Sequence, residues 1–356
     1  MYINTSIFTT ELTLVLIVCV IIYYLSILFW NNKAHRYFKK QSKGVQNISF
    51  TQTDIPTFGG LLLITNITIC NIFQVTDSSS ILLYSMILFA LPMIIVSSIE
   101  DFYFNVSPYL RLLSIFISAL LFLVFVDFTF PSIQIPYIDS LFENNWTRYI
   151  FYSLALTTLI NGMNVIDGVN GLALSTSLAA LISLALISFQ IGDLLIYKVS
   201  VLISLFITVM ILFNYPIGKI FLGDTGAYWL GWALGILLIL FYGRNQYLPS
   251  WGAILICFYP CMEIIFSFFR KILIKNNPFY PDPNHIHLKL YFLLNKKIKN
   301  KFIANNLVMP LLSIFWLLPP MLALKNYNNL NLLVISIFIC LFLYILIFLF
   351  LPKVKS

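Results

Sequence analysis

Four short polar clusters interrupt an otherwise apolar sequence, and the first of them pairs two acids. Glu100 and Asp101 close one apolar run, and Arg111 lies at the start of the next. Carboxylate oxygens suit Mg²⁺, which usually takes one or two carboxylates and fills its remaining positions with water and substrate phosphates. Two adjacent acids also suit proton transfer. For this pair alone, a solvated helix end is the plainer interpretation.

The second cluster is the most specific signal in the chain. Asn161, Asn164, Asp167 and Asn170 fall within one short stretch that also contains three glycines. Glycine lets a backbone approach a ligand closely, and irregular backbone at membrane depth occurs where it lines a polar cavity. A helix-breaking turn alone needs fewer polar residues. The cluster therefore favours a site for a nucleotide or a phosphate.

Asn214 and the run Phe-Leu-Gly-Asp-Thr-Gly, from Phe221 to Gly226, form the third cluster. Asp224 is suited to bind a metal ion, and the glycines beside it leave space for one. Thr225 can instead cap the helix that follows, whose positive N-terminus favours an anionic ligand. The two interpretations are compatible with each other.

The fourth cluster contains two of the three histidines. His285 and His287 follow Asp282 in a segment rich in lysine. Histidines at positions i and i+2 can bind zinc, but no cysteine lies nearby and Asp282 is the one close third ligand. The charge of histidine favours contact with phosphate instead.

The elements that carry these clusters are predicted to lie in a membrane. Of 356 residues, 60% are hydrophobic and 10% are charged, whereas soluble domains have roughly 25% charged residues. Apolar runs of about 20 residues, enough for a transmembrane helix, recur along the whole chain. We therefore predict a single all-α, polytopic membrane domain over residues 1–356, with about 10–11 transmembrane helices. The candidate runs are 11–30, 56–76, 80–99, 108–126, 148–166, 171–190, 194–215, 225–242, 249–269, 305–324 and 331–351.

The distribution of basic residues predicts the orientation. With the N-terminus outside, 17 of the 21 lysines and arginines fall on the cytoplasmic side, as the positive-inside rule requires, and the C-terminus is then cytoplasmic. The acids of all four clusters fall on that same side, which predicts one shared site because membrane acids are costly unless functional. The predicted cytoplasmic loops lie near 31–55, 100–107, 167–170, 216–224 and 271–304.

Two other classes of function are disfavoured. The net charge of +8 is explained by topology and by anionic lipid headgroups, so no nucleic-acid partner is expected. The five cysteines all lie inside apolar runs, which indicates neither a disulfide framework nor a zinc site.

Taken together, the motifs resemble those of the polyprenyl-phosphate N-acetylhexosamine-1-phosphate transferases, in the branch that initiates polysaccharides. The resemblance covers nearly the full length of the chain. It runs from Pro-Thr-Phe-Gly-Gly at residues 56–60 through the acid pair, the Asn-x-x-Asn-x-x-Asp-Gly run and Phe-Leu-Gly-Asp-Thr-Gly to Asp-x-x-His-x-His. Five motifs in the same order are hard to obtain by chance.

The resemblance implies a role for each cluster. The implied metal ligands are Asp224 and Asp101, and the implied catalytic residues are Glu100, Asp101 and Asp167. The implied nucleotide- or substrate-binding residues are Asn161, Asn164, Asn170, Asn214, Phe221, His285 and His287. Three positions depart from the usual family pattern: Glu100 replaces an aspartate, Asn170 replaces a second acid, and Leu288 stands where many members have another histidine.

The resemblance also implies a reaction. A sugar-1-phosphate, from a UDP-N-acetylhexosamine, is transferred to undecaprenyl phosphate, with Mg²⁺ (or alternatively Mn²⁺) as cofactor and release of UMP. The implied location is the bacterial inner membrane, with the active site on the cytoplasmic face, membrane lipids around the protein and homodimers among its relatives. A transporter or flippase, and an inactive family member that serves as a scaffold, remain as alternatives.

Overall fold

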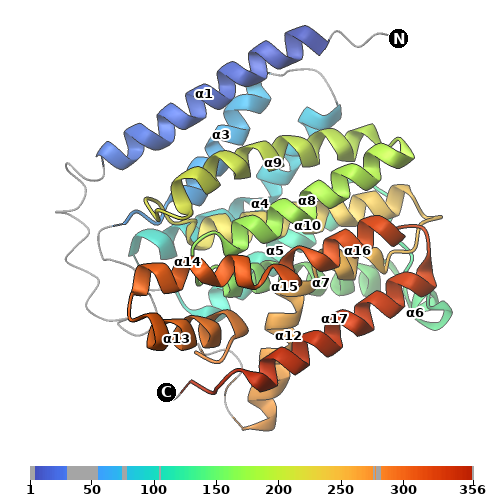
Figure 1. Ribbon diagram of the computed structural model, residues 1–356. Coiled ribbons are helices and arrows are strands. Elements are labelled where there is room, and N and C mark those ends of the chain that lie inside the picture. Colours follow the sequence, from blue (N-terminus) through green and yellow to red (C-terminus); the bar gives the residue numbers. More distant parts are fainter. Residues whose placement is uncertain are drawn as a thin grey trace.

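The computed structural model describes residues 5–29, 55–73, 78–103, 106–275, 277 and 282–354. Within these residues every regular element is a helix, which confirms the all-α prediction (Figure 1). The helices are α1 (Thr5–Phe29), α3 (Gly59–Phe73), α4 (Ser78–Tyr103), α5 (Pro108–Phe125), α6 (Pro136–Leu141), α7 (Asn145–Ile166), α8 (Leu172–Ile191), α9 (Leu194–Asn214), α10 (Gly223–Arg244), α11 (Gly252–Ile256), α12 (Phe258–Leu273), α13 (Ile286–Ile298), α14 (Lys301–Leu311), α15 (Ser313–Trp316), α16 (Leu318–Asn326) and α17 (Leu330–Phe350). The predicted loop near 31–55 lies outside the described residues except for Ile55.

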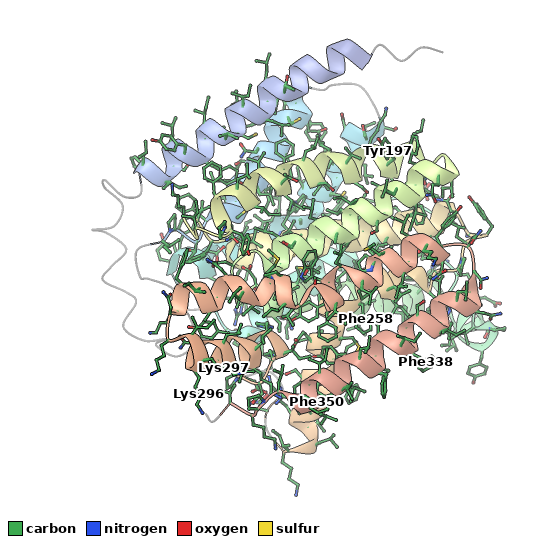
Figure 2. All side chains as sticks on the ribbon, viewed as in Figure 1. Tyr197, Phe258, Lys296, Lys297, Phe338 and Phe350 are labelled. Carbon is green, nitrogen blue, oxygen red and sulfur yellow. The ribbon has the colours of Figure 1, made fainter. Side chains whose placement is uncertain are left out.

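The chain is a polytopic membrane protein by the length and apolar character of its helices. Among the described residues, 8 helical segments are long and apolar enough to cross a membrane, and α1 and α3 contribute two shorter apolar stretches. The outer helices keep large apolar side chains exposed, as Phe338 and Phe350 on α17 illustrate (Figure 2). Such exposure is costly in water and favourable in lipid.

α10 is the central helix of the bundle. Every residue in the apolar, membrane-spanning stretch of α10 is buried. α10 packs against α3, α4, α7 and α8. Its contact with α3 is very close, because a Cβ built on Gly60 would lie 2.1 Å from the Cα of Gly226. Two backbones can approach this closely only where both residues are glycine.

Prolines break two of the predicted runs. The run 249–269 is divided at Cys257 into α11 and α12, because Pro260 has no N–H for the carbonyl of Ile256. The run 305–324 is likewise divided into α14, α15 and α16, the last of which begins with two prolines. The polar segment 271–304 also differs from a simple loop, since it contains the helix α13.

The predicted cytoplasmic segments gather at one end of the bundle. At this end α4, α7, α9 and α17 end, and α5, α8, α10 and α13 begin; it lies to the lower left in Figure 1, around α13, while α12 runs down to the bottom of the view. At the opposite end, near α6, Ser250 donates a hydrogen bond to the carbonyl of Ser132 (2.7 Å) and Arg244 pairs with Asp193 (3.0 Å). The residues of the four clusters therefore share one end of the protein.

Candidate active site

The N-terminus of α10 is capped by a carboxylate from another helix. Asp101, in the last turn of α4, accepts hydrogen bonds from the backbone N–H groups of Asp224 (2.7 Å) and Thr225 (3.0 Å). A negative charge is favourable at this position because the first N–H groups of a helix lack partners. The prediction that Thr225 caps α10 is wrong, because α10 begins at Gly223 and Thr225 lies inside its first turn.

One arginine joins the two acidic clusters. Arg111, at the start of α5, donates a hydrogen bond to Asp224 (3.1 Å) and lies 3.7 Å from Glu100. Glu100 also accepts a hydrogen bond from the N–H of Val106 (2.8 Å). The structure thus brings Glu100, Asp101 and Asp224 into one group, although more than a hundred residues separate α4 from α10 in sequence.

Asp167 faces this group from the end of α7. Its pKa is raised well above the usual aspartate value, first by burial and then by the negative charges of Asp224 and Asp101. Within the described residues, no hydrogen bond to its carboxylate is found. Asn164, one turn earlier, donates a hydrogen bond to the hydroxyl of Tyr228 on α10 (3.3 Å). A half-buried carboxylate that accepts no hydrogen bond is suited to meet a cation.

Replacing Asp167 by asparagine should stabilise the metal-free protein at neutral pH. Because folding raises the pKa of Asp167, the folded protein loses stability as the pH rises from about 4 through the folded pKa. Asparagine removes that cost. We expect a higher thermal midpoint for Asp167→Asn than for the wild type near pH 7 in EDTA, and a smaller difference as the pH falls. A lower midpoint at neutral pH would contradict this account.

Two residues predicted to bind the nucleotide make backbone contacts. Asn214 accepts a hydrogen bond from the N–H of Gly171 (2.7 Å) and donates one to the carbonyl of Ile220 (2.9 Å), so it joins two turns of the site. The backbone of Phe221 pairs with residues 56 and 59, which ties the start of α3 to the site. Both residues therefore shape the loops around the carboxylates.

The other two predicted asparagines lie on either side of Asp167. Asn170 donates its backbone N–H to the side chain of Asn305 on α14 (3.0 Å), and its amide donates to Asn306 (3.5 Å). Asn161 is half-buried on α7, three residues before Asn164. Of the asparagines predicted to bind the nucleotide, Asn161 and Asn164 lie on α7, the helix that ends just before Asp167.

The segment that contains His285 and His287 lies against the turn that follows Asp167. His285 shares a hydrogen bond with Glu263 (Nδ1 to Oε2, 2.9 Å), and the N–H of Ile286 donates to the other oxygen of Glu263 (3.1 Å). His287 lies against the turn after Asp167, because a Cβ built on Gly168 would be 2.9 Å from its Nε2. Burial lowers the pKa of His287 below its usual value, which keeps the ring neutral near pH 7.

Glu263 is the residue that sequence reasoning missed. It lies within the apolar run 249–269 and is 1% exposed. A lone acid inside such a run is the available signal, since intramembrane acids are functional candidates by default.

Asp282 closes the segment before α13. It forms an ion pair with Arg270, at the end of α12, and accepts a hydrogen bond from the N–H of Asn284 (2.8 Å). Burial opposes ionisation of Asp282, but these hydrogen bonds and the charge of Arg270 outweigh it and lower the pKa. Asp282 therefore fixes the chain on α12 and is not grouped with the histidines.

The donor set suits a metal ion that is shared with substrate oxygens. Among the described residues, no three His, Cys, Asp or Glu side chains are grouped to hold a metal ion, which disfavours the zinc alternative at His285 and His287. Mg²⁺ needs only one or two carboxylates when phosphates supply the rest. Asp224 and Asp167 fit that requirement, whereas both oxygens of Asp101 are engaged by N–H groups.

Comparison with known proteins gives matches over the part of the chain that holds the carboxylates. Residues 83–242 match the family model of Glycosyl transferase family 4. A probable undecaprenyl-phosphate N-acetylglucosaminyl 1-phosphate transferase of Bacillus subtilis is 32% identical over 158 residues, which are 44% of this chain and 44% of that protein. An undecaprenyl-phosphate alpha-N-acetylglucosaminyl 1-phosphate transferase of Thermotoga maritima is 32% identical over 139 residues, 39% of this chain and 41% of that protein.

A phospho-N-acetylmuramoyl-pentapeptide-transferase of Prochlorococcus marinus is 31% identical over 213 residues, 55% of this chain and 57% of that protein. Each of these three matches thus covers less than two thirds of the relative. The matched family region contains the carboxylate group with Arg111 and Asp167, but it ends before Glu263 and the histidines.

Proposed function

We propose that this chain, whose residues 83–242 match the family model of Glycosyl transferase family 4, transfers a sugar-1-phosphate from a UDP-sugar to undecaprenyl phosphate. The sugar is an N-acetylhexosamine, and UMP is released. An oxygen of the lipid phosphate attacks the phosphorus that carries the sugar, and the bond from that phosphorus to the bridging oxygen of UMP breaks. One phosphoanhydride replaces another, so catalysis depends on positioning and on neutralisation of charge.

The observation that carries this proposal is the carboxylate group at the N-terminus of α10, where Asp101, Asp224 and Arg111 are joined by hydrogen bonds. Two phosphate anions must approach each other during the transfer, and their repulsion must be screened. Asp224 and Asp167 would hold Mg²⁺, or alternatively Mn²⁺, which would supply that screening and stabilise the charge on the departing UMP. Arg111 holds Asp224 in place from α5.

The remaining residues take roles that follow from their positions. Glu100, at the edge of the group, accepts the proton of the lipid phosphate in a direct attack. Asn161 and Asn164 on α7, with Asn170 and Phe221 in the adjoining turns, bind the nucleotide. His285 and His287 contact the sugar or its phosphate from the start of α13.

An apolar cavity supports a lipid as one of the substrates. It has a volume of about 510 Å³ and is lined almost entirely by apolar side chains of α7, α10, α11 and α12 and of the loops at the end opposite the carboxylates, among them Leu156, Leu238, Ile254 and Ile133. An apolar lining accepts a hydrocarbon chain from the bilayer without removing polar groups from their partners. The cavity therefore fits part of a polyprenyl tail.

The proposed location is the bacterial inner membrane, with the site on the cytoplasmic face. The end of the bundle that carries the carboxylates also carries most of the basic residues that the structure describes, among them the exposed Lys296 and Lys297 of α13 (Figure 2), as the positive-inside rule predicts for the cytoplasmic side. The same grouping argues against a transporter or flippase, which holds its substrate near the midplane of the membrane. A homodimer remains part of the proposal.

The proposal is tested with the purified protein in detergent. We expect UMP release from a UDP-N-acetylhexosamine only when undecaprenyl phosphate and Mg²⁺ are both present, and the best donor in a panel identifies the sugar. Omission of the lipid is the control for simple hydrolysis. Absence of UMP release with every donor, from a protein that is folded by circular dichroism, would favour the inactive scaffold.

A further inference from the structure

Glu263 is a buried carboxylate that is hydrogen-bonded to the start of α13. It lies on α12 and is 1% exposed. One oxygen lies 2.9 Å from Nδ1 of His285, and the other accepts the N–H of Ile286 at 3.1 Å. His285 is the residue that precedes α13, and its own side chain makes no capping hydrogen bond. Glu263 therefore supplies the negative charge that the N-terminus of α13 would otherwise lack.

The contact with Glu263 decides which nitrogen of His285 carries a proton. An ionised carboxylate can only accept hydrogen bonds, so Nδ1 of His285 must be the donor. Nε2 is then the nitrogen that remains for a ligand. In many sites a carboxylate behind a histidine sets its tautomer and ring orientation in this way.

Glu263 also lies close to the second histidine. Nδ1 of His287 is 3.8 Å from Glu263, and the rings of His285 and His287 are stacked with centroids 5.6 Å apart. Both ring nitrogens of His287 are buried and have no hydrogen-bond partner within the described residues. Nε2 of His287 faces the Asp167–Gly168 turn, where a Cβ on Gly168 would lie 2.9 Å from it. Glu263 thus connects α12 with the carboxylate side of the site through the two histidines.

We propose that Glu263 is a positioning residue of the transfer site, which fixes the proton of His285 on Nδ1 and holds His287 against the Asp167–Gly168 turn. Glu263 touches neither the substrates nor the reacting atoms. The expected effect of Glu263 on turnover rests on the proposed transferase function. The expected effect of Glu263 on the tautomer of His285 is independent of that function.

The small number of histidines makes the tautomer directly measurable. The chain has three, His35, His285 and His287, so the ¹⁵N spectrum of the protein with labelled histidine contains few signals. The variants His35→Gln and His285→Asn assign them. We expect Nδ1 of His285 to be protonated in the wild type, and this preference to be lost in Glu263→Gln, whose amide presents a donor to one of its two partners. An unchanged tautomer in Glu263→Gln would overturn the inference.

Turnover provides the second readout. Loss of a group that orients a ligand typically costs about 10- to 100-fold in activity, so we expect kcat for UMP release to fall at least tenfold in Glu263→Gln, with a much smaller change in KM. The matched control is Glu143→Gln, at an exposed position before α7 on the opposite end of the bundle, which should behave as the wild type. Wild-type kcat in Glu263→Gln would contradict a positioning role.

A second variant covers the case in which Glu263→Gln does not fold. Asparagine at position 285 can donate to Glu263 as Nδ1 does, but it lacks Nε2. We expect His285→Asn to fold with a normal thermal midpoint and to lose at least tenfold in kcat. Full activity in this variant would overturn the inference. If the tautomer changes as expected but the wild-type protein transfers no sugar-phosphate, the proposed function fails and the contact between Glu263 and His285 stands.

Discussion

The variant Asp224→Asn should release UMP roughly 10³-fold more slowly than the wild type, because one carboxylate that binds the metal ion is lost at the site where charge develops. The asparagine is nearly isosteric, and its carbonyl oxygen can still accept the hydrogen bond that Arg111 donates to Asp224. Its backbone N–H still reaches Asp101. We therefore expect the start of α10 to keep its structure, and the loss to appear in kcat rather than in the thermal midpoint.

The measurement is a comparison of initial rates over a range of Mg²⁺ concentrations. The matched control is Asp127→Asn, an exposed aspartate that follows α5 at the opposite end of the bundle, and it should keep wild-type activity. If Asp224→Asn keeps more than about a tenth of the wild-type rate, Asp224 is not the principal metal ligand.

The variant Gly223→Ala should cause the largest loss of stability among single substitutions at the site. Gly223 has φ of +73°, and a Cβ there would lie 2.0 Å from the carbonyl oxygen of Thr57 and 2.8 Å from Asp101. The left-handed backbone costs an alanine about 1–2 kcal/mol, and forcing atoms into a packed region adds about 1–3 kcal/mol. The clash also pushes Asp101 away from the N–H groups of α10, so activity should fall with stability.

Gly192→Ala separates the two causes of this loss. Gly192 has φ of +83°, but a Cβ there would meet nothing within 4 Å. The thermal midpoint of Gly192→Ala should therefore fall only by the cost of the backbone conformation, and its activity should be that of the wild type. Equal losses of midpoint in the two variants would show that the contact with Thr57 and Asp101 contributes nothing.

Sequence patterns located the helices well because the membrane imposes a simple rule on them. A helix that crosses lipid must be apolar for about 20 residues, and the runs 80–99, 108–126 and 331–351 each fall within or beside one observed helix. The rule fails where proline removes a backbone hydrogen bond, as it does before Pro260. It also says nothing about the amphipathic helix α13, which lies in a polar segment.

The place of the site residues could be predicted from the sequence, whereas their individual tasks could not. The alternation of helix directions was enough to put Asp101, Asp167 and Asp224 at one end. Whether a polar side chain faces a ligand or the backbone depends on partners that are distant in sequence, and Asn214 illustrates this because both ends of its amide bind backbone groups. Glu263 was missed for the same reason, since its partner His285 lies 22 residues further along the chain.

The most direct test of the account follows the phosphate that carries the sugar. A UDP-N-acetylhexosamine labelled with ³²P at that phosphate is incubated with the protein, Mg²⁺ and undecaprenyl phosphate, and the lipid is then extracted from the nucleotides. The label is expected to enter the lipid together with the sugar, while the released UMP is unlabelled. Label that stays in a released UDP, with the sugar alone on the lipid, would contradict it.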